Sequence, residues 1–167
     1  MDTAVEANVA PEKPNPAPVD PGKTFMALTF DLDGERFAIS VSNVQEVIDP
    51  LQMTRVPNAD AFAPGLINVR GAVVPVLNLH HRLGIDERER TGDTRYVVIE
   101  ANILDERTHF AITADSVHEV LEISERDIRT APELGMKWPP EYILGIAQRA
   151  HGMLIFLDTE CIFRPEN

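Results

Sequence analysis

The hydrophobic pattern takes a period of two along a stretch of the chain that begins at Thr24, with Thr29 and Asp31 on the opposite face. Its apolar positions fall on every second residue: Met26, Leu28, Phe30 and Leu32. A period of two is typical of a half-buried β-strand. The alternation resumes at Phe37 after Asp33-Gly34, a pair that favours a two-residue hairpin turn because both central positions of that turn need positive φ. The pattern therefore predicts a β-hairpin.

The period changes directly after this hairpin. The Ser42 hydroxyl can cap a helix, and the side chain of Gln45 can reach back to it. Apolar residues then follow at helical spacing: Val41, Val44 and Ile48. We therefore predict a short helix that begins at Ser42 and contains Glu46.

Turn residues bracket the segment 63–71, and the segment 72–79 that follows is apolar apart from Asn78. Pro75 lies inside this apolar run and cannot donate a hydrogen bond to a neighbouring strand, which predicts a strand at an edge or a bulge. A sheet edge is a place where another segment can pair. The remaining strand patterns are a second hairpin at 96–99 and 109–112 and final strands at 143–147 and 153–157. The count predicts mainly β structure with short helices.

The chain contains an internal duplication. Residues 37–48 align with residues 110–121 without a gap, and six of the twelve positions are identical. Further on, Gly65 and the strand after it resemble Gly145 and its following strand at a slightly larger offset. The spacing is too long for a solenoid, whose units are about 20 to 50 residues. It predicts two similar lobes that share a core and leave a groove, because about 70 residues are marginal alone.

Composition narrows the class of protein. The 167 residues suit one domain or two small lobes, and 27 acidic against 15 basic residues give a formal charge of -12, which opposes binding to nucleic acid. The single Cys161 fits a reducing compartment, and no apolar run is long enough to cross a bilayer, so we expect a cytoplasmic protein without direct membrane insertion. Residues 1–23 carry five of the thirteen prolines. They are predicted to be a disordered Pro-rich tail before a single domain at 24–167.

The spacing of potentially reactive residues matches no catalytic motif. The chain has no Gly-x-Ser-x-Gly elbow and no phosphate-binding loop, and none of its five histidines forms a helical metal pair. We therefore predict no catalytic residue, no metal site and no cofactor. Glu46 and Arg70 stand out among the charged residues. They either form a structural ion pair or present an arginine that anchors a partner.

Two motifs together resemble the signature of the CheW-domain family. The first is Val44-Gln45-Glu46-Val47-Ile48, and the second runs through 65–79, where the turn Asn68-Val69-Arg70-Gly71 is followed by Pro75. The resemblance extends from about Phe25 to Phe163. It implies two SH3-like five-stranded β-barrels packed side by side with short helices, in agreement with the duplication.

The same resemblance implies a non-enzymatic adaptor that couples chemoreceptors to a histidine kinase. Its partners would be the cytoplasmic tip of a chemoreceptor and the regulatory domain of a CheA-type kinase, in arrays at the inner face of the membrane. Residues that match contact positions of the family are Val44, Glu46, Arg70 and Val117. Gly65 and Asn68 are further candidates, although a tight turn explains both without a partner. Two alternatives are a CheW-like scaffold of a non-flagellar pathway such as pilus motility, and a small-ligand binder in the groove between the lobes.

Overall fold

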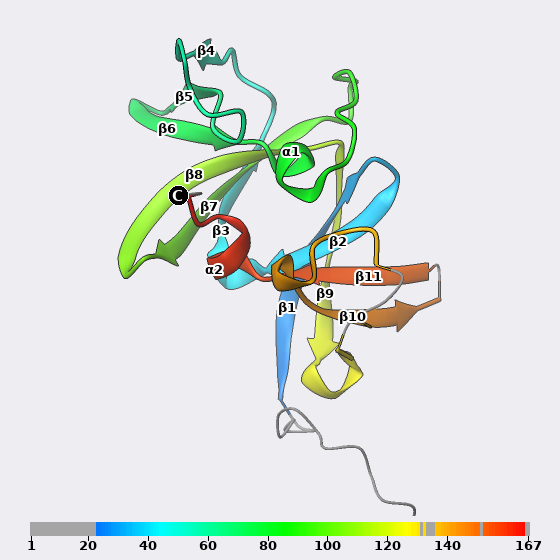
Figure 1. The fold of residues 1–167 in the computed structure, drawn as a ribbon. Coiled ribbons are helices and arrows are strands. Elements are labelled where there is room, and N and C mark those ends of the chain that lie inside the picture. The colour runs from blue at the N-terminus through cyan, green and yellow to red at the C-terminus, as the bar shows by residue number, and fades with distance from the viewer. Residues whose placement is uncertain (1–22, 131, 133–135, 151, 166–167) are drawn as a thin grey trace, which may run out of the picture.

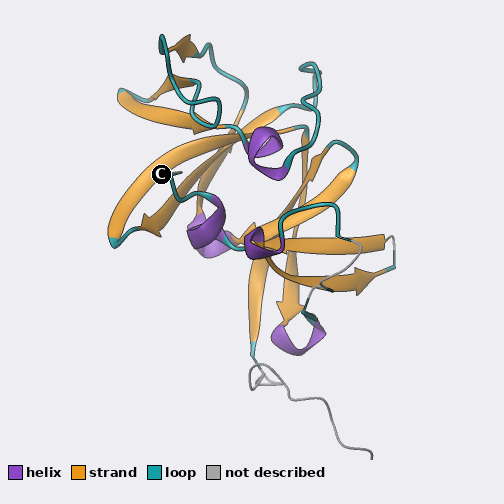
Figure 2. Ribbon diagram, viewed as in Figure 1, coloured by secondary structure: helices purple, strands orange, loops and turns teal. Residues whose placement is uncertain are grey.

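Two β-sheets make up most of the structure, and the helical segments between them are short (Figures 1 and 2). The computed structural model describes residues 23–130, 132, 136–150 and 152–165. Apart from Lys23, the Pro-rich tail predicted at 1–23 therefore lies outside the described residues. The division into a tail and one domain at 24–167 stays a prediction.

Each sheet with its connections forms one lobe. Lobe 1 has the strand order β10-β11-β2-β1-β9, and lobe 2 has the order β3-β7-β8-β6-β5-β4. The strands are β1 (Thr24–Leu32), β2 (Glu35–Ser40), β3 (Val44–Ile48), β4 (Thr54–Arg55), β5 (Gly65–Val69), β6 (Ala72–Leu77), β7 (Arg95–Ile103), β8 (Glu106–Ala114), β9 (Ser116–Ser124), β10 (Ile143–Arg149) and β11 (Gly152–Leu157). The α-helices are α1 (Leu79–Leu83) and α2 (Thr159–Ile162), and the 3-10 turns are η2 (Val41–Asn43), η3 (Glu125–Asp127) and η4 (Pro140–Tyr142). The predicted mainly β fold is confirmed, with the two-residue β4 as a sixth strand in lobe 2.

The two sequence repeats do not correspond to the two lobes, because they exchange hairpins. The β1–β2 hairpin of the first repeat joins β9, β10 and β11 of the second, whereas the β7–β8 hairpin of the second joins β3, β5 and β6 of the first. A parallel pair links the repeats in each lobe: β11 with β2, and β6 with β8. Neither lobe can therefore form from one half of the chain.

The predicted hairpins are confirmed at both of their turns. Asp33 and Gly34 join β1 to β2 with φ of 49° and 82°, and Leu104 and Asp105 join β7 to β8 with φ of 51° and 66°. Positive φ at both central residues matches the right-handed twist of the flanking strands. Asp33-Gly34 is a favourable pair for this geometry, whereas Leu104 is an unusual residue there.

The helix predicted from Ser42 is wrong. A single 3-10 turn spans 41–43, and the residues after it form β3, which pairs with β7. A β-bulge between Val44 and Glu46 shifts the register and hides the strand period in the sequence. Since Val44 pairs with Ile99 and Val47 with Val97, Val44 and Val47 lie on one face of the sheet, and Glu46 lies on the other.

The prediction of an edge at Pro75 is only partly met. β6 lies between β5 and β8 in the sheet and is therefore not an edge strand. However, its pairing with β8 is confined to Val76 and Leu77. Pro75 has no N–H to donate, so the ladder to β8 stops there and the two strands diverge.

One hydrophobic cluster reaches through both lobes, as the expected shared core requires. It includes Phe30 and Phe37 of lobe 1 and Ile99 and Phe110 of lobe 2, each at most 1% exposed. The Trp138 ring packs edge-on against Phe37 at a centroid distance of 5.4 Å.

Candidate partner-binding site

The β5–β6 turn presents the most exposed of the predicted site residues. Arg70 and Gly71 form this turn with φ of 53° and 90°. The side-chain oxygen of Asn68 accepts a hydrogen bond from the Gly71 N–H at 2.7 Å, which braces the turn from inside. The side chain of Arg70 is 79% exposed at the tip. Asn68 thus shapes the turn, and Arg70 points to solvent.

Glu46 and Arg70 form the ion pair that the sequence suggested. Arg70 Nη1 lies 3.2 Å from Glu46 Oε2. β3 is at one end of the strand order and β5–β6 is near the other end, so the sheet must curl for the two side chains to meet. The side chain of Glu46 is half-buried, at 25% exposed, whereas that of Arg70 is 79% exposed. Solvent therefore screens the pair from the arginine side, and its effect is mainly to orient the guanidinium. The remaining Arg70 donors bond to no acceptor in the described part of the chain.

Gly65 has a structural explanation. A Cβ atom at Gly65 would lie 2.5 Å from the carbonyl oxygen of Thr54 and 2.7 Å from Met53 Cγ. Such a contact is too close for a real side chain, so glycine allows the chain at Met53 and Thr54 to pack directly against β5 here. Gly145 occupies the corresponding place in lobe 1, where a Cβ atom would meet Ile128 and the Arg129 carbonyl oxygen.

A groove separates the lobes on the side of β3 and β9. It has a volume of about 540 Å³ and is lined by Val47, Asp93, Arg95, Ser116, Val117 and His118. Val117, which the sequence singled out, lies on the lobe 1 wall. Val47 lies on the lobe 2 wall and is 39% exposed, and Val44 shares its sheet face. Of the predicted residues, only Val117 lines the groove, and Val44 is half-buried against the hydrophobic core. Glu46, Asn68 and Arg70 meet at the turn.

Sequence reasoning missed Val47, Arg95 and His118 of this groove. The helical interpretation of 42–48 concealed the exposed Val47. The duplication could have pointed to it, because Val44 and Val47 align with Val117 and Val120. Both pairs of valines flank the same β-bulge in the two lobes.

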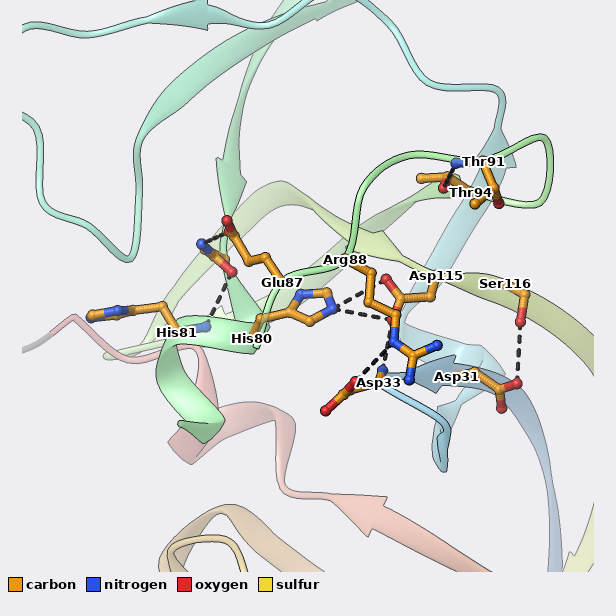
Figure 3. A network of polar contacts seen from close by, with 11 residues as sticks. Asp31, Asp33, His80, His81, Glu87, Arg88, Thr91, Thr94, Asp115 and Ser116 are labelled. Atoms are coloured by element: carbon orange, nitrogen blue, oxygen red, sulfur yellow. Dashed lines mark hydrogen bonds and ion pairs between the residues drawn. The ribbon is translucent and has the colours of Figure 1, made fainter. Parts of the chain in front are cut away.

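A polar network next to the groove ties the lobes together (Figure 3). Asp115 lies where the chain passes from β8 in lobe 2 to β9 in lobe 1. Its Oδ2 accepts a hydrogen bond from the Asp33 N–H of lobe 1 at 2.6 Å, and its Oδ1 lies 3.2 Å from Nε2 of the buried His80 on α1. Arg88 reaches Asp33 Oδ1 at 2.8 Å. These contacts fix how the two groove walls face each other.

Asp31 carries the charge nearest to His118 of the groove. The Asp31 carboxylate lies 2.8 Å from His118 Nε2 and 3.1 Å from Arg36 Nε. Burial alone would raise the pKa of Asp31. The hydrogen bonds and positive charge of His118 and Arg36 outweigh burial and hold this pKa below its usual value.

Within the described residues, no three His, Cys, Asp or Glu side chains converge in a way that could hold a metal ion. In the same part of the chain, no helix is both long and apolar enough to cross a membrane.

Comparison with known proteins identifies the fold and its class. Residues 26–166 match the CheW-like domain family. The chemotaxis protein CheW of Klebsiella aerogenes is 33% identical over 139 residues, which cover 83% of this chain and 81% of that protein. The crystal structure of the scaffolding protein TtCheW from Thermoanaerobacter tengcongensis superimposes with a TM-score of 0.76 at 28% identity, over 86% of this chain and 90% of that one. A more distant relative, Protein PilI of Pseudomonas aeruginosa, is 26% identical over 85 residues, 51% of this chain and 48% of PilI.

The chain therefore belongs to the CheW-like domain family. It is a chemotaxis scaffold, an adaptor and not an enzyme, as the resemblance of its motifs predicted.

Proposed function

We propose that this adaptor binds the cytoplasmic tip of a chemoreceptor and the regulatory domain of a CheA-type histidine kinase at the same time. It would do so in the cytoplasm, in arrays at the inner face of the membrane. The observation that carries the proposal is the arrangement of Arg70, whose side chain is 79% exposed and whose guanidinium is held by Glu46 through a single nitrogen. A planar, always charged group held this way is suited to anchor a partner.

The groove between the lobes supports a second contact. Val47 and Val117 line opposite walls, and an amphipathic receptor helix can bury apolar side chains between them. Val44 shares the face of Val47 and would extend the contact. Asn68 and Gly65 would act indirectly: Asn68 shapes the turn that presents Arg70, and Gly65 allows close packing against β5.

The test is titration calorimetry of the full chain against the kinase regulatory domain from the same cell, and then against a receptor-tip fragment. Saturable binding to both is expected. Arg70→Glu places a second carboxylate beside Glu46 and removes the anchor, so ternary-complex affinity should fall at least tenfold. The thermal midpoint should fall only slightly, because the substituted side chain is 79% exposed and solvent screens its charge.

Lys137→Glu is the matched control. Lys137 is 70% exposed and pairs with Glu35 at 3.0 Å in lobe 1, so the variant loses a comparable surface ion pair away from Arg70. It should bind normally. Unfolding of Arg70→Glu would show that the Glu46–Arg70 pair is structural, and a folded wild-type protein that binds neither partner would end the proposal.

The similarity to PilI favours one second candidate, the same adaptor role in pilus motility. Titration against the receptor and kinase of each pathway in the same cell distinguishes the two. The pathway whose components bind is the physiological one.

A further inference from the structure

Lobe 2 has an open sheet seam between β6 and β8. β8 pairs with β7 along its whole length, but it pairs with β6 only at Ala111 and Ile112. The outer edge of β8 at 106–110 thus has no strand partner among the described residues. β6 at 72–75 likewise pairs only with β5. Two unpaired strand edges face each other across a gap that Pro75 opens.

Apolar side chains line this gap. The pocket has a volume of about 360 Å³, and its lining includes Phe62, Pro75, Leu77, Leu104, Phe110 and Phe163. Phe110 and Phe163 pack together at a centroid distance of 4.4 Å and are almost fully buried. Pro75 and Leu77 come from β6, whereas Leu104 comes from the β7–β8 turn.

Leu104 has an exposed apolar side chain and an unfavourable backbone conformation, which suggests that a partner covers it. It is 63% exposed and adopts φ of 51°, a left-handed conformation that branched side chains rarely tolerate. The corresponding turn in lobe 1 uses Asp33-Gly34. Backbone strain that persists at one position is a pointer to function, because the rest of the structure must maintain it.

The charge around the pocket selects its occupant. Asp60 and Glu106 line it, and no Lys or Arg does so among the described residues. Residues 1–22 carry Asp2, Glu6, Glu12 and Asp20 against a single lysine, so the chain's own tail matches poorly. A second copy of this chain, with a formal charge of -12, is also disfavoured by repulsion.

We propose that this seam is a docking site for an extended segment of another protein that alternates aliphatic and basic residues. The segment pairs with the free edge of β8, places an aliphatic side chain in the pocket beside Leu104, and sets a basic side chain against Asp60 and Glu106. Strand addition of this kind takes affinity from the backbone and specificity from alternate side chains. The pocket is lined neither by Arg70 nor by any residue of the groove, so the proposal does not depend on the function proposed above.

The experiment uses the full chain and two synthetic ten-residue peptides, one alternating Lys with Val and one alternating Glu with Val. Amide chemical shifts are followed during titration. Saturable shifts are expected at Val73, Leu104 and Thr108 with the Lys peptide, and at least tenfold weaker binding with the Glu peptide. Leu104→Asn should weaken binding of the Lys peptide at least tenfold, and asparagine tolerates the left-handed turn, so the fold is kept.

Leu144→Asn is the matched control, since Leu144 is 59% exposed on β10 of lobe 1. It should leave binding unchanged. Equal binding of both peptides, shifts located elsewhere, or a Leu104→Asn variant that binds normally would each overturn the proposal. Self-association of the full chain that Leu104→Asn abolishes in sedimentation would overturn it too, by assigning the seam to a second copy.

Discussion

The two lobes have the same strand plan but present different chemistry at corresponding positions. In lobe 2, Glu46 within the β3 bulge holds Arg70 at the tip of the β5–β6 turn. In lobe 1, Glu119 lies within the matching β9 bulge, but the corresponding turn residue is Ala150. No basic side chain pairs with Glu119 in the described part of the chain. The duplication thus preserves the framework, whereas the exposed arginine belongs to one lobe alone.

The hairpins differ in the same way. Phe37 and Phe110 are equivalent core residues, yet Phe37 lies two residues beyond the start of β2 and Phe110 lies four beyond the start of β8. The β7–β8 hairpin is therefore longer by two residues in each arm. That extra length carries Leu104 out over the apolar pocket. At these equivalent positions the two lobes have the same residue where it faces the core, and different residues where the position faces solvent.

The largest expected effect comes from the shared core. Phe37→Ala and Phe110→Ala should each lower the free energy of unfolding by about 3–5 kcal/mol. The two losses should be similar, and each variant should unfold in a single transition, because each lobe contains strands from both repeats. Urea denaturation followed by Trp138 fluorescence and by circular dichroism measures this. Two separate transitions would mean that the lobes are energetically independent.

A smaller effect is expected at the equivalent glycines. Gly65→Ala and Gly145→Ala introduce a methyl group against the chain segment packed on each glycine, 53–54 and 128–129 respectively. Overpacking of this kind costs about 1–3 kcal/mol. Gly92→Ala is the control, since a Cβ atom there would meet nothing within 4 Å. If only one of the two buried glycines proved sensitive, the two close contacts would not be equivalent.

Transfer of the arginine to lobe 1 tests whether the pair alone makes a binding site. Glu119 and Ala150 line one hollow of about 610 Å³, so the side chain of Ala150→Arg can reach the carboxylate. Stability should change by at most about 1 kcal/mol. Calorimetry should show no second binding event for either partner, because the lobe 2 surroundings are missing. A doubled stoichiometry would show that the ion pair is sufficient.

The smallest effect concerns pH. The pKa of folded Asp31 lies below its usual value, so the folded state favours the carboxylate. Its contribution to stability is present above the ordinary pKa of aspartate, about 3.9, and is lost as the pH falls through the lower folded value. Carboxyl chemical shifts should give a midpoint for Asp31 below about 3.9, and Asp31→Asn should flatten this part of the stability profile. A midpoint at or above the ordinary value would contradict the account.

Local patterns predicted what depends on local geometry. The Asp33-Gly34 turn, the second hairpin and the duplication follow from residue type and period. The Glu46–Arg70 ion pair is one of the two hypotheses that the sequence supports for these residues. The β3 bulge was not predictable in this way, because Val44 and Ile48 satisfy a helical spacing of four as well as a strand. The sequence also does not determine which strands the β1–β2 hairpin joins. The two repeats have similar apolar strand patterns, so the hairpin could pair with the strands of either repeat. The bond between His80 and Asp115 depends on that long-range choice.

The exchange of hairpins between the repeats governs how the chain is made. When the first repeat leaves the ribosome, its hairpin has no sheet to complete, because β9, β10 and β11 have not been synthesised. At about 5–20 residues per second, the apolar faces of β1 and β2 wait for several seconds before their partners emerge. Lobe 2 has all of its strands once β8 has emerged, whereas lobe 1 also needs β9, β10 and β11. A chain truncated before β11 therefore contains every strand of lobe 2 but leaves lobe 1 unfinished.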